Sequence, residues 1–117
     1  MLTKEMTKTE IEQELMKKGD FVKIDYLDRL LKDKQLATDK RKFVLAKLAE
    51  IYEKRGMFID AAKIYKNIAI YSMTFSEKIT NHVKEAESYI KGSSLDLADE
   101  ALKKALGEAP AGERDNI

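Results

Sequence analysis

The sequence predicts an all-α protein of about six helices, arranged as antiparallel helical hairpins that stack into a short solenoid. Apolar residues recur with a helical period along the chain, and no strand-like alternation persists. Glycines follow the periodic runs at Gly19, Gly56, Gly92 and Gly107, where a left-handed C-cap would end a helix. A two-helix segment also repeats itself within the chain, which is typical of a stacked helical array.

The composition excludes several classes of protein. The 117 residues are 44% hydrophobic and 37% charged, which is enough apolar material for one domain with its own core. The chain has no Cys, no Trp and one His, so we expect no disulfide scaffold, thiol nucleophile or zinc finger. No apolar stretch has the length of a secretory signal or a membrane span, and we therefore expect a cytoplasmic protein that does not enter a membrane.

Residues 1–38 are predicted to form an N-terminal capping hairpin. Its first helix, over 8–18, begins at Thr7 and Glu10, which have capping-box spacing. Its second helix, over 21–32, has a broader apolar face, formed by Phe21, Ile24, Leu27 and Leu31. The apolar stripe of the first helix is narrow, as expected for a unit that covers the end of a stack.

Residues 39–109 are predicted to form two further hairpins. Their helices are expected over residues 40–55, 58–72, 75–91 and 95–109. Thr74 and Glu77 again have capping-box spacing before the third of these helices. The connections are short, which favours antiparallel neighbours. Residues 110–117 contain few apolar side chains, and we expect a disordered tail there.

A shift of 37 residues places the second hairpin on the third. The segment KLAEIYEK at 47–54 then lies on KEAESYIK at 84–91, with five identical pairs. Small side chains let two helices approach closely, and they recur at matching places, at Ala49, Ala61, Ala86 and Ala98. A single hairpin cannot bury its apolar face, whereas a stacked neighbour covers it. An unrelated antiparallel bundle is the alternative, since any such bundle matches part of this pattern.

Residues 42–110 resemble tetratricopeptide repeats. In the first unit Leu45 occupies the place of the family's Trp, Leu48 and Ala49 the Leu-Gly places, and Tyr52 the Tyr place. The pattern continues with Ala61 and Tyr65 in the first unit, and with Ala86, Tyr89, Ala98, Leu102, Ala105 and Pro110 in the second. The second unit departs from the pattern at His82 and Glu85, and the offset of 37 exceeds the family period of about 34 residues.

The resemblance implies a non-catalytic protein–protein interaction module, or adaptor. Proteins of this family bind peptides or partner helices along a concave surface built from the first helix of each unit. The implied partner-binding residues are Phe43, Lys47, Glu50 and Lys54 in the first unit, and Thr80, Lys84, Glu87 and Lys91 in the second. The repeated Lys–Glu–Lys sets would place alternating charge along one groove, which suits a mixed-charge peptide.

Two alternative functions remain open. The segment 29–66 carries 11 basic and 5 acidic residues, and its run Lys40, Arg41 and Lys42 could contact phosphates in an RNA- or ribosome-associated factor. The chain could instead be a structural module that self-associates, so a monomer and a weak homodimer are both compatible with the sequence.

We expect neither an enzyme nor a metal or cofactor site. His82 and Glu85 form an H-x-x-E pair, but a metal centre of this type needs counterparts on facing helices, and the chain has no second His. We therefore expect His82 at a surface or half-buried position. The carboxylates, Glu85 included, are predicted on polar helix faces among Lys and Arg, where they would form surface pairs rather than acid–base catalysts.

Overall fold

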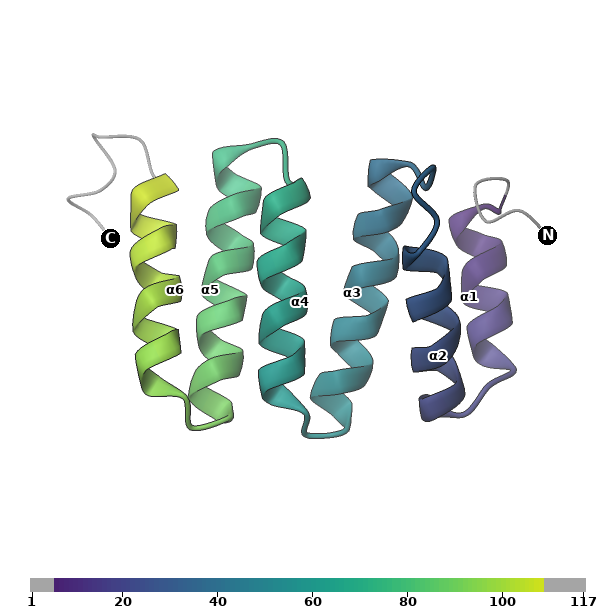
Figure 1. Ribbon diagram of the computed structural model, residues 1–117, viewed down its shortest axis with the longest axis horizontal. Coiled ribbons are helices and arrows are strands. Elements are labelled where there is room, and N and C mark those ends of the chain that lie inside the picture. Colours follow the sequence, from purple (N-terminus) through teal and green to yellow (C-terminus); the bar gives the residue numbers. More distant parts are fainter. Residues whose placement is uncertain (1–5, 109–117) are drawn as a thin grey trace.

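The computed structural model describes residues 6–108, which form six helices that follow one another along the longest axis of the molecule (Figure 1). The helices are α1 (Lys8–Met16), α2 (Asp20–Leu31), α3 (Thr38–Lys54), α4 (Phe58–Tyr71), α5 (Phe75–Lys91) and α6 (Leu95–Glu108). Successive helices run antiparallel, and the molecule measures 48 × 29 × 19 Å. The predicted all-α class and the stack of helical hairpins are confirmed. The tail predicted at 110–117 lies outside the described residues.

The two predicted capping boxes differ. At α1, Thr7 Oγ1 accepts a hydrogen bond from the Glu10 N–H at 3.1 Å, and the Thr7 N–H donates to Glu10 Oε1 at 3.2 Å. At α5, Thr74 Oγ1 accepts from the Glu77 N–H at 3.0 Å, which forms half of the box. The Glu77 carboxylate instead accepts from the Met73 N–H at 3.2 Å, and this leaves it pointing toward α3. The second box is therefore only partly formed.

The hairpins α3–α4 and α5–α6 share one register. Every boundary of α5 and α6 lies 37 residues after the matching boundary of α3 and α4. The turn hydrogen bonds also correspond, from the N–H groups of Arg55, Gly56 and Met57 in the first hairpin and of Gly92, Ser93 and Ser94 in the second. Ala61 and Ala98 are both buried, so the small residues hold equivalent places in the two copies.

One turn position differs chemically between the copies. Gly56 adopts the left-handed conformation, with φ at 74°, and at the matching place the left-handed residue is Ser93, with φ at 63°. The expected left-handed cap at Gly92 is therefore wrong, because Gly92 precedes that position and has φ at −88°. The expectation also fails for Gly19, which is the N-cap of α2, and for Gly107, which lies inside α6.

Ser93→Gly is expected to raise the free energy of unfolding by about 0.5–1 kcal/mol, because glycine adopts a positive φ without the steric cost of a Cβ atom. Urea unfolding measures the difference. Gly56→Ser is the matched control, and it should lower stability by a similar amount, since a Cβ at Gly56 would meet open space and only the backbone would be strained. An unchanged midpoint in both variants would contradict this account of the turn.

Two apolar clusters hold the row of helices together. The first joins α1, α2 and α3, and its buried members are Met6, Ile11, Leu15, Leu27, Leu30, Val44, Leu48 and Ile51. The second joins α4, α5 and α6 through Ala62, Ala86, Tyr89, Ala98 and Ala101. Ile11 and Leu15, which form the narrow apolar stripe of α1, are both buried in the first cluster. Side-chain packing therefore anchors the N-terminal hairpin on α3.

The second copy carries polar groups at positions where the first is apolar. His82, Glu85 and Ser88 are all buried, and they stand 37 residues after Leu45, Leu48 and Ile51, which are buried too. Glu85 is only 1% exposed, so its predicted place on a polar face is wrong, as is the surface or half-buried place predicted for His82. The reason is the shared register, since the packing of α5 buries these positions whatever residue they carry.

Candidate partner-binding surface

A groove of about 360 Å³ runs between α3 and α5. It is lined by Lys8 of α1, by Asp39, Lys42, Phe43 and Ala46 of α3, by Tyr65 and Ile68 of α4, and by Glu77, Asn81 and Lys84 of α5. Side chains therefore reach it from the first helix of both repeated units and from the helix between them. The apolar atoms come mainly from Phe43, Tyr65 and Ile68, while the edges are charged.

A smaller hollow of about 120 Å³ shares Tyr65 and Lys84 with this groove. Its lining is completed by Glu53, Glu87, Ser88 and Lys91. Because the two hollows share side chains, they adjoin along the line between α3 and α5. We call them together the α3–α5 groove.

An ion pair joins the two walls of the α3–α5 groove at one end. Lys42 Nζ lies 3.1 Å from Glu77 Oε1, which links α3 to α5. The hydrogen bonds that Glu77 accepts from Lys42 and from the Met73 N–H hold the pKa of Glu77 below its ordinary value. Because the Glu77 carboxylate does not complete the capping box at Thr74, it can pair with Lys42 and link the two walls of the groove.

Tyr65 occupies the middle of the α3–α5 groove. Its hydroxyl donates a hydrogen bond to Glu53 Oε1, and Lys84 Nζ lies 5.7 Å from the centre of its ring. Burial raises the pKa of the Tyr65 phenol, and the hydrogen bond to Glu53 raises it further. The ring is therefore held in place from both walls.

Four of the eight predicted partner-binding residues line the α3–α5 groove, namely Phe43, Lys84, Glu87 and Lys91. Lys47 and Glu50 instead line a separate hollow of about 310 Å³ beside α1 and α2. Lys47 Nζ lies 2.8 Å from Glu12 Oε1 of α1, and this hydrogen bond raises the pKa of Lys47.

The other two predicted residues lie apart from these hollows. Lys54 pairs with Asp20 of α2 at 3.5 Å, and Thr80 is exposed and lines none of the three hollows. The eight residues therefore do not all line one groove, and partner binding by them remains a prediction.

The reason is the geometry of translation-related helices. Two such helices meet through opposite flanks, so equivalent positions cannot face each other across the groove between them. From α3 the groove receives Lys42 and Ala46, and from α5 it receives Glu77, Asn81 and Lys84. Glu77, Asn81 and Ile68 line the groove but were not predicted from the sequence. The sequence predicted that the Glu77 carboxylate would complete the Thr74 capping box, so it gave no signal that Glu77 lines the groove.

The basic run at the start of α3 is largely engaged within the chain. Arg41 donates hydrogen bonds to the carbonyl oxygens of Leu31 at 3.0 Å and Asp33 at 2.7 Å, and its guanidinium lies 5.6 Å from the ring centre of Tyr71. Lys42 forms the ion pair with Glu77, and Lys40 is half-buried. Arg41 thus satisfies carbonyls at the end of α2 and closes the loop that leads into α3.

Two buried polar residues of α5, His82 and Glu85, form a small cluster with Lys104 of α6. His82 Nδ1 lies 3.0 Å from Glu85 Oε1, and Lys104 Nζ lies 3.8 Å from Glu85 Oε2. Within residues 6–108, no group of three or more His, Asp and Glu side chains is arranged to hold a metal ion. The cluster is an internal polar network and is not part of the α3–α5 groove.

The fold and the groove define an all-α stack of helical hairpins with a mixed-charge surface groove. Comparisons with protein-family models, with curated proteins and with solved structures found no match. Over the part of the chain that the structure describes, every helix is too short or too polar to cross a membrane.

Proposed function

We propose that this chain is a non-catalytic interaction module similar to tetratricopeptide repeats, and that it binds a peptide or partner helix along the α3–α5 groove. The observation that carries the proposal is the groove itself, which two equivalent hairpins form with an apolar base and charged edges. This combination suits peptide recognition, because apolar contacts supply affinity and charges select the partner. A cytoplasmic location is a further part of the proposal.

The charges of the groove favour a ligand with acidic residues. Lys84 and Lys91 lie one above the other on α5, over the rings of Tyr65 and Phe58. Within the described residues, neither ammonium group has a carboxylate within 4.0 Å, whereas Lys42 is already paired with Glu77. Lys84 and Lys91 are therefore the cations that remain available to carboxylates of a bound segment.

Nucleic-acid binding by the basic segment remains a prediction. We do not include it in the proposed function, because Arg41 and Lys42 already form hydrogen bonds and an ion pair within the chain.

Selection from a random peptide library tests the proposal. We expect the selected peptides to carry acidic residues, and the double variant Lys84→Glu/Lys91→Glu to bind them at least about tenfold more weakly. The matched control is Lys63→Glu/Lys66→Glu, which changes the net charge equally at two exposed positions of α4 that line none of the three hollows. Equal weakening in both variants, or amide chemical-shift changes confined to the hollow beside α1 and α2, would contradict it.

A further inference from the structure

The last helix of the row carries an uncovered apolar stripe. Leu95, Leu102 and Leu106 are 65%, 45% and 38% exposed, although α6 buries Ala98, Ala101 and Ala105 against the rest of the stack. The three leucines share one side of α6, because they are separated by seven and four residues. We call them the α6 stripe.

The internal repeat shows what such a stripe does elsewhere in the chain. The residues 37 positions earlier are Phe58, Tyr65 and Ala69 of α4, and α5 partly covers Phe58 and Tyr65, which are half-buried. Lys91 and Lys84 of α5 lie over the rings of Phe58 and Tyr65, and Ala69 is buried. The α6 stripe is therefore equivalent in position to a face of α4 that the next helix partly covers within the same molecule.

The opposite end of the row does not complement this face. Lys8 and Glu12 of α1 are exposed but pair with Asp39 and Lys47 of α3, so they do not lie at the outer end. The other exposed residues of α1 are Thr9, Gln13 and Met16, of which one is apolar. Stacking the α6 end of one molecule on the α1 end of another would bury leucines against the polar side chains of Thr9 and Gln13. Head-to-tail association of successive molecules is therefore disfavoured. The remaining arrangement is a contact between the α6 ends of two molecules.

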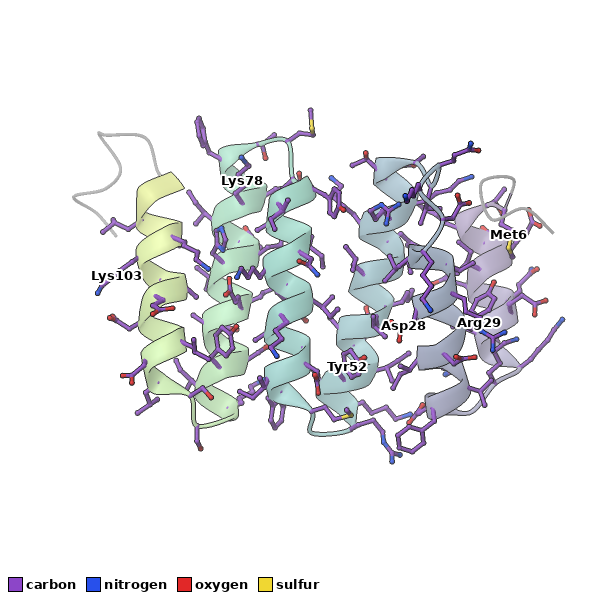
Figure 2. The ribbon with its side chains drawn as sticks, viewed as in Figure 1. Met6, Asp28, Arg29, Tyr52, Lys78 and Lys103 are labelled. Atoms are coloured by element: carbon purple, nitrogen blue, oxygen red, sulfur yellow. The ribbon has the colours of Figure 1, made fainter. Side chains whose placement is uncertain are left out.

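The charges beside the α6 stripe of one copy can complement those beside the α6 stripe of a second copy. Asp96 and Asp99 lie in the first half of α6 and Lys103 in the second half, where Figure 2 shows it pointing away from α5 at the free end of the row. Lys103 Nζ lies 3.1 Å from Asp99 Oδ2 of the same helix, but both side chains are largely exposed, and the structure gives Asp96 no such pair within residues 6–108. If two α6 helices pack antiparallel about a two-fold axis, the acidic half of each lies opposite Lys103 of the other. Parallel packing would instead place like charges together.

We propose that two copies of this chain associate through the α6 stripe, with their α6 helices antiparallel. The contact is small, because each copy contributes three partly exposed leucines and a few charges, so the dimer is weak and depends on concentration. It leaves the α3–α5 groove open in both copies, and it does not depend on the function proposed for that groove.

Sedimentation of the full chain over a concentration series tests the association. We expect the wild-type mass to rise toward that of a dimer, and Leu102→Glu to remain monomeric at concentrations where the wild type is mostly dimeric. Leu97→Glu is the matched control, since Leu97 is 40% exposed but lies on a different side of α6, and it should associate as the wild type does. Circular dichroism and thermal unfolding of each variant check that the fold is retained.

Charge reversal tests the antiparallel arrangement. Asp96→Lys should weaken the dimer, and adding Lys103→Asp in the same chain should restore it, because each new charge again meets its opposite across the two-fold axis. A wild-type chain that stays monomeric at millimolar concentration would overturn the proposal. So would a Leu102→Glu chain that dimerises normally.

Discussion

The double variant His82→Leu/Glu85→Leu is expected to be more stable than the wild-type chain by about 1–4 kcal/mol, whereas His82→Leu alone should be less stable by about 3 kcal/mol. Glu85 is 1% exposed and its carboxylate relies on His82 at 3.0 Å and on Lys104 at 3.8 Å. Removing His82 leaves a buried carboxylate with only one distant partner, which is costly.

The double variant restores the residues that the first copy carries at these places. Leu45 and Leu48 are both buried at the positions matching His82 and Glu85, so leucine fits the register of the repeat. Replacing both residues removes the free-energy cost of burying two polar groups, and it leaves no buried polar group of the pair without its partner. Thermal and urea unfolding of the two single variants and the double variant complete a double-mutant cycle.

The exposed pair of Arg29 and Asp25 on α2 is the control for this cycle. Their charged atoms lie 3.0 Å apart and both side chains are largely exposed, so Arg29→Leu should change stability by less than about 1 kcal/mol. A His82→Leu variant as stable as the wild type, or a double variant less stable than both single variants, would contradict the proposed role of the buried pair.

Leu48→Ala is expected to lower the free energy of unfolding by about 2–5 kcal/mol. Leu48 is fully buried in the cluster that joins α1, α2 and α3, and it packs with residues such as Ile11 and Leu27. Shortening it removes apolar contacts and leaves a cavity at the centre of the N-terminal half. Domains of this size have total stabilities of about 5–15 kcal/mol, so the loss is a large share of the whole.

Leu97→Ala is the matched control for that variant, because Leu97 of α6 is 40% exposed and its truncation should cost less than about 1 kcal/mol. Urea unfolding of both variants measures the difference between them. Equal stability of the Leu48→Ala and Leu97→Ala chains would show that the N-terminal hairpin is not packed on α3 as described.

The helices and the register of the repeat were predictable because they depend on residues close together in the chain. Backbone hydrogen bonds of a helix join residues four apart, and the Thr7 capping box joins residues three apart. The 37-residue match between KLAEIYEK and KEAESYIK likewise lies in the sequence itself, and the helix boundaries follow it. Even so, Ser93 shows that the left-handed turn position follows the register rather than the nearest glycine.

Which residues are buried and which residues line the groove could be known only from the packed structure. Glu85 resembles any surface glutamate in the sequence, and it is buried because α5 and α6 close over a position that the first copy fills with Leu48. Lys47 and Lys84 are equivalent in sequence, yet Lys47 pairs with Glu12 of α1 while Lys84 lines the α3–α5 groove. Each repeated helix has different neighbours on its two flanks, and those neighbours come from distant parts of the chain. Local sequence therefore specifies which side chains exist on a helix face, but the packing of the helices specifies what each of them meets.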